Sequence, residues 1–192
     1  RLIHAESDYL PGLIVDRYDD LLAVQLTTAG MELERGELIA ALEQVVRPSR
    51  IVLRNDTAVR ELEGMEQSIE WVLGDDPGEI ELIEGEVRFG VSPGSGQKTG
   101  WFFDQAENRL ALRRFGPAAR VLDVCCWLGG WGLQAAANGA DAITVVDSSA
   151  AALEHVGDNA ERNGFADRIT GLQGDAFDAL RALRDEEARF DL

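Results

Sequence analysis

Apolar and polar positions alternate in blocks along the second half of the chain. Three short apolar runs predict strands, at 121–124, 142–146 and 168–173. Helices are predicted between them, over 133–138 and from Ser148 or Ser149 to about Asn163, where Gly164 ends the second helix. Strands that alternate with helices in this way are typical of a parallel sheet, so we expect an α/β domain over 93–192.

The first half has a different pattern. Alternation or short apolar runs predict strands at 12–18, 21–26, 50–53, 80–83 and 87–91. Residues 32–46 carry apolar side chains close to helical spacing, and Pro48 ends that helix. The order strand, strand, helix, strand, strand, strand predicts a small α+β module over 1–92, with a boundary near the Pro- and Gly-containing stretch 92–96.

A glycine-rich loop follows the first strand of the second domain. It begins after Asp123 and contains Gly129, Gly130 and Gly132. Glycine lets the backbone turn sharply and approach a ligand, and the helix that follows offers unpaired N–H groups at its start. Loops of this kind hold nucleotide-like cofactors beyond the carboxyl ends of the strands.

Each of the three strands ends near a carboxylate, at Asp123, Asp147 and Asp175. An acid at the tip of the second strand can accept hydrogen bonds from both ribose hydroxyls of an adenosine. S-adenosylmethionine carries a sulfonium cation and an amino group and has no phosphate, so carboxylates around the loop favour it. The alternative, that such acids only cap helices, explains a single Asp better than three in register.

A dinucleotide is the other cofactor to consider. Gly130-x-Gly132-x-x-Ala135 formally matches the dinucleotide fingerprint. However, five residues separate Asp123 from Gly129, whereas the first glycine of the fingerprint follows its strand almost at once. Asp123 would also lie where a pyrophosphate disfavours negative charge. An NAD-dependent oxidoreductase is therefore the weaker interpretation.

The net charge of −17 over 192 residues limits the class of partner. It disfavours non-specific nucleic-acid binding, although a local basic groove stays compatible with it. It also fits a high-salt habitat, which predicts that stability falls as salt is removed. No apolar run approaches the roughly 18 residues that span a bilayer, no signal peptide is evident, and the two cysteines are adjacent, so we expect a cytoplasmic protein without a membrane partner.

The segment that joins the two predicted domains mixes Gly, Lys, Thr and Gln with three aromatic residues. Because it precedes the first strand, it can fold over the cofactor crevice, where Lys98 and Arg109 could face the carboxylate of a methionine moiety. Two alternatives stay open: the aromatic side chains cover the edge of the sheet, or Arg109 pairs with Asp104 or Glu107.

Two sets of motifs carry a family resemblance. The first is Gln97-Lys98-Thr99-Gly100-Trp101-Phe102-x-Asp104-Gln105-x-x-x-Arg109, followed by the loop from Asp123 to Gly132. The second is Leu10-Pro11-Gly12-Leu13-Ile14-Val15-Asp16-Arg17-Tyr18, with Arg54-Asn55-Asp56-x-x-x-Arg60-x-x-Glu63-Gly64. Over essentially all 192 residues, the chain resembles the 23S ribosomal RNA large-subunit methyltransferases, most closely the cytosine-C5 branch.

The resemblance implies a Rossmann-like, S-adenosylmethionine-dependent methyltransferase domain and a 23S rRNA substrate, and it leaves a homodimer open. In the family a PUA domain precedes this region and the catalytic domain continues beyond it. We therefore expect the chain to be a fragment, with the catalytic residues, including a cysteine nucleophile, beyond Leu192. No metal site is expected, because His4 and His155 have no ligand partner at useful spacing.

The resemblance also implies which residues contact the cofactor: Lys98, Thr99, Phe102, Asp123, Cys125, Gly129, Gly130, Asp147, Ser148, Asp175 and Ala176. The first three would close over it, and the acid and glycines of the loop would hold its amino acid end. The pair at 147–148 would bind the ribose and the pair at 175–176 the adenine. Where the family's first motif has Tyr and Thr, this chain has Trp127, which keeps an aromatic wall, and Leu128, which loses a hydroxyl.

The chemistry that the family implies begins with a cysteine thiolate that adds to C6 of the flipped-out cytosine, so that C5 can attack the sulfonium methyl group. Cys125 and Cys126 lie in the cofactor loop and are more simply explained there than as that nucleophile. A related branch methylates guanine N7 and shares the Gln-Lys-Thr-Gly segment. A non-catalytic RNA-binding scaffold with a methyltransferase fold is the remaining alternative.

Overall fold

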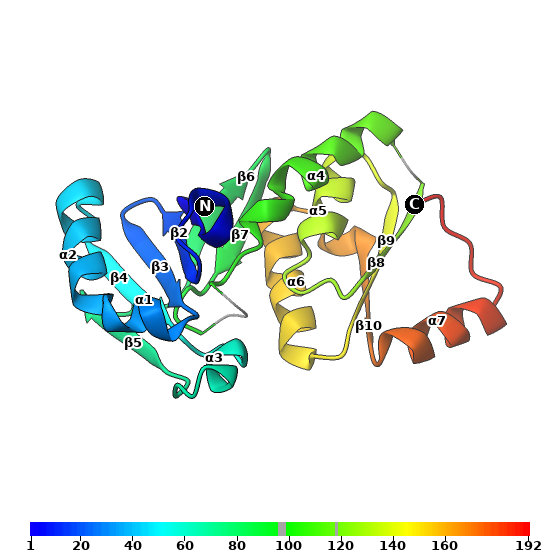
Figure 1. The fold of residues 1–192 in the computed structure, drawn as a ribbon. Coiled ribbons are helices and arrows are strands. Elements are labelled where there is room, and N and C mark those ends of the chain that lie inside the picture. Colours follow the sequence, from blue (N-terminus) through cyan, green and yellow to red (C-terminus); the bar gives the residue numbers. More distant parts are fainter. Residues whose placement is uncertain (96–98, 118) are drawn as a thin grey trace. The chain divides into compact units, whose positions relative to one another are not determined.

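The computed structural model describes residues 1–95, 99–117 and 119–192 (Figure 1). The chain forms two compact units. The first unit comprises Arg1–Ile80 and Val91–Asp104, and the second comprises Glu81–Gly90 and Gln105–Leu192. The segment 81–90, which the sequence pattern groups with the α+β module, thus packs with the C-terminal part of the chain.

The first unit is built on a five-stranded sheet in the order β1-β2-β3-β4-β5. Its strands are β1 (Ile3–His4), β2 (Leu13–Tyr18), β3 (Leu21–Leu26), β4 (Arg50–Arg54) and β5 (Ile69–Leu73). The pair β3 and β4 is parallel and the other pairs are antiparallel. Leu22, Val24, Ile51 and Leu53 are fully buried in the core cluster that also contains Leu42 of the helix connecting β3 to β4.

That connection consists of two helices, although the sequence pattern predicts one over 32–46. They are α1 (Ala29–Leu33) and α2 (Arg35–Val46), separated at Glu34. The helical region begins earlier than the apolar stripe because the side chain of Thr28 accepts a hydrogen bond from the N–H of Met31 and caps α1. Strand β5 and the short helix α3 (Val59–Leu62) are further elements that the pattern does not reveal.

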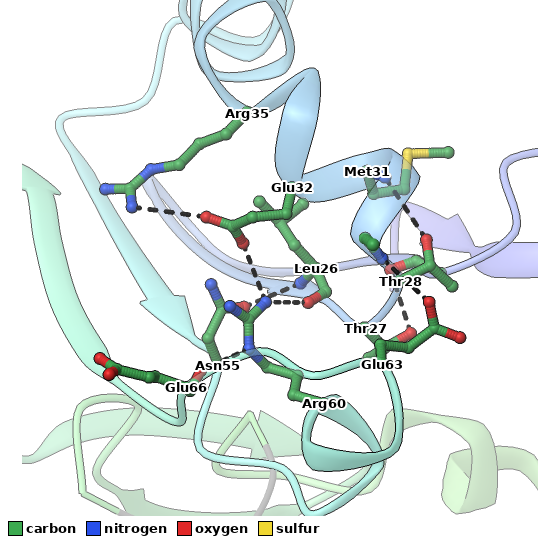
Figure 2. Close-up of polar contacts among 12 residues, drawn as sticks. Leu26, Thr27, Thr28, Met31, Glu32, Arg35, Asn55, Arg60, Glu63 and Glu66 are labelled. Atoms are coloured by element: carbon green, nitrogen blue, oxygen red, sulfur yellow. Dashed lines mark hydrogen bonds and ion pairs between the residues drawn. The ribbon is translucent and has the colours of Figure 1, made fainter.

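Figure 2 shows how Arg60 of α3 is held at the end of β3. Its buried guanidinium donates to the carbonyl oxygens of Leu26 and Glu66 and forms an ion pair with Glu32 at 2.9 Å. Asn55 accepts the N–H of Leu26 at 2.9 Å. Two members of the upstream motif therefore fix the loop after β4 against the end of β3, a structural task within the first unit.

The second unit contains a parallel sheet in the order β10-β9-β8. Its strands are β8 (Arg120–Val124), β9 (Ala142–Asp147) and β10 (Ile169–Gln173). The helices of this unit are α4 (Ala106–Leu110), α5 (Gly130–Ala137), α6 (Ala150–Asn163) and α7 (Ala176–Asp185). Alternation of strand and helix confirms the predicted α/β class, and Gly164 ends α6 in the left-handed conformation, as expected.

Two further features lie outside this three-stranded sheet. The hairpin of β6 (Ile80–Glu84) and β7 (Val87–Val91) forms a separate two-stranded sheet. Residues 191–192 run beside β8, where the N–H of Asp191 donates to Arg120 at 2.8 Å and the N–H of Leu122 donates to Leu192 at 2.9 Å. In the described part of the chain, no helix is both long and apolar enough to cross a bilayer.

Candidate cofactor site

The register of the parallel sheet brings the predicted acids to one edge. Val124 is paired with Val146, and Asp147 is paired with Gln173. Asp123, Asp147 and Asp175 therefore follow or end neighbouring strands at the carboxyl edge, where α/β sheets bind their ligands. The glycine-rich loop and the start of α5 lie at the same edge because they follow β8 directly.

Asp123 is buried, and one of its carboxylate oxygens accepts the N–H of Gly132 at 2.9 Å. Burial is the main cause that raises the pKa of Asp123, the hydrogen bond from Gly132 lowers it and the negative charge of Asp147 raises it, with a net value of about 6. A carboxylate that is costly to ionise in this way is stabilised by a bound cation. The amino group of a methionine moiety supplies one.

Asp147 ties the loop to the second strand. One carboxylate oxygen accepts the N–H of Trp127 and the other accepts the N–H of Ser149, each at 3.0 Å. Each oxygen keeps a second lone pair, so the carboxylate can still accept from ribose hydroxyls. Ser149 caps α6 by accepting from Ala152, whereas Ser148 is exposed beside it.

The loop has an unusual backbone. Cys125 and Trp127 have φ of 61° and 51°, in the left-handed region that side chains rarely adopt, and Gly129 has φ of 79°. A Cβ on Gly129 would lie 3.1 Å from Val156, and one on Gly132 would lie 3.3 Å from the carboxylate of Asp123. The glycines thus allow the chain to pass close to α6 and to the acid.

Gly130 begins α5 and is buried, and Gly129 precedes it at the N-cap. At the third strand, Asp175 caps α7 by accepting the N–H groups of Phe177 and Asp178 on one oxygen, and Ala176 begins that helix. Asp175 is exposed, and a carboxylate has a second oxygen that can accept from a donor such as an adenine amine.

The linking segment divides into described and undescribed parts. Lys98 lies outside the described residues. Thr99 is fully buried in the first unit, where its hydroxyl donates to Asp16 and its carbonyl accepts from the Tyr18 hydroxyl at 2.8 Å. Phe102 is half-buried in the same unit. The contacts of these three residues with a cofactor stay predictions.

The two cysteines differ. Cys125 is exposed, and Cys126 is buried. Burial, together with the charges of Asp123 and Asp147, raises the pKa of Cys126 to about 12. Cys126 is therefore a neutral thiol at physiological pH.

Three side chains that hold parts of the second unit together were not evident in the sequence. Arg109 is buried and forms an ion pair with Glu84 of the β6–β7 hairpin at 2.6 Å, a residue not among the predicted partners. Asn159 and Asn163 of α6 hold the backbone of β7. No local signal marks these residues, because their partners lie 25 to 75 positions away in the chain.

The arrangement fits S-adenosylmethionine better than a phosphate-bearing cofactor. Two carboxylates stand at the loop, and the Nε1 donor of Trp127 is buried with no hydrogen-bond partner in the described part of the chain. A Cβ on Gly129 would press on Val156 and one on Gly132 on Ile143 and Val145, so glycine is needed for the loop to pack this closely on α6 and the sheet. The two carboxylates suit a cationic amino acid end joined to an adenosine.

Comparison with known proteins identifies relatives along the whole chain. A family model for S-adenosylmethionine-dependent methyltransferases matches residues 1–192. Ribosomal RNA large subunit methyltransferase I of Aeromonas hydrophila is 38% identical over 195 residues, and that of Vibrio cholerae is 37% identical over 196 residues. Each alignment covers 100% of this chain and 49% of the relative, so the chain spans about half the length of these proteins.

Solved structures show the same fold. The methyltransferase SMU.776, solved in complex with SAH, superimposes with a TM-score of 0.85 at 23% identity, over 100% of this chain and 49% of that one. The tRNA m1G37 methyltransferase of M. jannaschii gives a TM-score of 0.66 at 17% identity, over 88% and 51%. Because the family model matches the whole chain, residues 1–192, this chain belongs to the S-adenosylmethionine-dependent methyltransferase family.

Proposed function

We propose that the chain is the cofactor-binding part of an rRNA methyltransferase that acts on C5 of a cytosine in 23S rRNA. The observation that carries the proposal is the edge where Asp123 and Asp147 flank the glycine-rich loop. The rRNA substrate is supported by the names of the relatives, and the cytosine by the resemblance of the Gln-Lys-Thr-Gly segment. Bound S-adenosylmethionine supplies an electrophilic methyl group on a sulfonium.

The residues of the second unit have separate tasks in this proposal. Asp123 and the backbone of Gly129 and Gly130 hold the amino acid end, and Asp147 with Ser148 binds the ribose. Cys125 is a residue of the same loop and contacts the cofactor in this proposal.

On the adenine side, Asp175 accepts from the exocyclic amine and Ala176 packs against the ring. Lys98, Thr99 and Phe102 of the linking segment contribute contacts of their own. The nucleophile in this proposal is a cysteine outside these 192 residues, because Cys125 and Cys126 both belong to the cofactor loop and the raised pKa of Cys126 opposes a thiolate there. The proposed site of action is the cytoplasm.

Cofactor binding is tested by calorimetric titration with S-adenosylhomocysteine, with NAD as the control ligand. Micromolar binding of the first alone, lost in Asp147→Ala, supports the proposal. Equal affinity for NAD would favour the oxidoreductase interpretation.

The substrate is tested with the full-length protein, S-adenosylmethionine carrying a labelled methyl group, and 23S rRNA from cells that lack the enzyme. Mass spectrometry of the digested RNA distinguishes 5-methylcytosine from 7-methylguanine. A 7-methylguanine product would assign the protein to the related branch. Retention of rRNA without cofactor binding would indicate a scaffold. Sedimentation of the same sample gives the oligomeric state.

A further inference from the structure

The side chain of Asn159 bridges two segments that lie far apart in the sequence. It is 1% exposed and projects from α6. Its Oδ1 accepts the N–H of Gly90 in β7 at 2.7 Å, and its Nδ2 donates to the carbonyl of Leu128 at 3.2 Å. Both ends of one buried amide are thus satisfied, one by the hairpin and one by the cofactor loop.

Leu128 stands at a sensitive point of that loop. Its carbonyl precedes Gly129, which adopts the left-handed conformation at the N-cap of α5. A Cβ on Gly129 would come closest to Val156, one turn before Asn159. Helix α6 therefore fixes both the direction of the Leu128 carbonyl and the path of the following glycine.

The neighbouring Asn163 makes a different set of contacts. Its Oδ1 accepts the N–H of Arg88 at 2.9 Å and its Nδ2 donates to the carbonyl of Arg88 at 2.6 Å. It binds β7 as a strand partner would, and within the described residues its hydrogen bonds go to Arg88 and Asn159 and not to the loop. Asn163 also donates to the carbonyl of Asn159 within the helix. Helix α6 lies beside β7 over this stretch (Figure 1).

The other strand of the hairpin is held by α5, the helix that begins in the loop. Gln134 of α5 donates to the carbonyl of Glu84 at 2.7 Å, and the Glu84 carboxylate pairs with buried Arg109. Side chains of the two helices that follow the loop along the chain, α5 and α6, therefore both form hydrogen bonds with the hairpin. Residues 81–90 belong to the second unit. They are flanked in the chain by Ile80 and Val91, which belong to the first unit.

We propose that Asn159 is a positioning residue that couples the β6–β7 hairpin to the cofactor loop, so that cofactor binding orders the hairpin and the hairpin in turn sets cofactor affinity. The coupling must act equally in both directions, since two linked equilibria share one coupling free energy. This inference rests on the proposed function, in which the loop binds S-adenosylmethionine.

Asn159→Asp separates the two contacts of the amide. The carboxylate still accepts from Gly90 and gains an ion pair with Arg162, whose guanidinium already donates to Oδ1 at 2.7 Å. At pH 8 it cannot donate to the Leu128 carbonyl, and its negative charge repels that oxygen, so the contact with the loop is the one that is broken. Asn163→Asp is the control, because it adds the same charge one turn later and removes the donations to the carbonyls of Arg88 and Asn159, neither of which belongs to the cofactor loop.

The first readout is hydrogen exchange of the ligand-free proteins. Asn159→Asp is expected to speed the exchange of amides at 126–133 and to spare 88–91, whereas Asn163→Asp is expected to do the reverse. Equal effects of the two substitutions on the loop would overturn the inference. Because no ligand is present, this comparison decides the role of Asn159 even if the proposed cofactor proves wrong.

The second readout is S-adenosylhomocysteine binding. Loss of one buried hydrogen bond is expected to weaken binding about tenfold in Asn159→Asp, with Asn163→Asp close to wild type. In the wild type, the ligand should slow the exchange of the amide of Gly90, and Asn159→Asp should abolish that effect. Bound ligand that protects the loop of the wild type without changing Gly90 would disprove the coupling, whatever the variants do.

Discussion

The carboxylate of Asp147, the last residue of β9, accepts the N–H of Trp127 at 3.0 Å. The acid that is proposed to bind the ribose thus also holds the loop after β8 in its left-handed conformation at Trp127. A single side chain links the second strand to the loop of the first. Substitutions of Asp147 consequently report on loop order as well as on ligand contacts.

Asp147→Asn is expected to weaken S-adenosylhomocysteine binding by tenfold or more, because an amide offers only one acceptor oxygen to the ribose. It should also lower the free energy of unfolding by about 1 kcal/mol, since its NH₂ group faces one of two backbone donors. Calorimetry and urea denaturation measure the two effects. Asp141→Asn, which removes the same charge from an exposed residue before β9, is the control. Equal losses in both variants would count against a ribose contact.

Asp123→Asn is expected to stabilise the ligand-free protein while it weakens cofactor binding. The pKa of Asp123 is raised to about 6, so the folded state binds a proton more tightly than the unfolded state. The protonated carboxyl group of Asp123 therefore contributes fully to stability below about pH 4, and this contribution is lost as pH rises through 6. Above that pH the buried charge costs about 3 kcal/mol, from about 1.4 kcal/mol per pKa unit.

The Asn side chain removes this cost and can still accept from Gly132. Thermal denaturation between pH 4 and 8 should show the variant gaining on the wild type as pH rises, while the affinity for S-adenosylhomocysteine falls at pH 8. A variant whose melting temperature follows that of the wild type at every pH would show that Asp123 does not carry a raised pKa.

Local patterns in the sequence were sufficient for the frame of the second unit. The strand at β9 and the stop of α6 at Gly164 follow from apolar runs and capping chemistry, which depend on neighbours in the chain. The edge where Asp123 and Asp147 meet follows as well, because parallel strands connected by helices align their carboxyl ends. These features need no knowledge of distant contacts.

Long-range partners could not be predicted in the same way. The pattern over 32–46 predicts one helix. In the structure Glu32 forms an ion pair with Arg60, 28 positions away, and the helix is interrupted at Glu34. The burial of Thr99 against Asp16 depends on a contact across 83 positions. Such pairs are set by how the sheet faces are covered, which periodicity does not encode.

Gly129→Ala is expected to lower the free energy of unfolding by about 2 kcal/mol and to weaken cofactor binding. Alanine at a φ of 79° costs about 1 kcal/mol or more, and its Cβ would approach Val156 within 3.1 Å. Gly157→Ala in α6 is the control, since its Cβ meets nothing within 4 Å and alanine should add about 1 kcal/mol. Chemical denaturation of the two variants should shift in opposite directions. Two shifts of the same sign would contradict the close packing of Gly129 against α6.

Glu84→Gln is expected to lower the free energy of unfolding by about 3 kcal/mol, because it removes the charge that faces the buried guanidinium of Arg109. The side chains of this pair are 8% and 3% exposed, so solvent screens them little. In the surface pair Arg184–Asp185 the side chains are 71% and 68% exposed, and Asp185→Asn should change stability by less than about 0.5 kcal/mol. Urea denaturation at 0.1 M and 1 M NaCl measures both. Since salt screens exposed charges and reaches buried ones poorly, the loss in Glu84→Gln should persist at high salt. If that loss vanished in 1 M NaCl, the ion pair with Arg109 would not be what holds the hairpin.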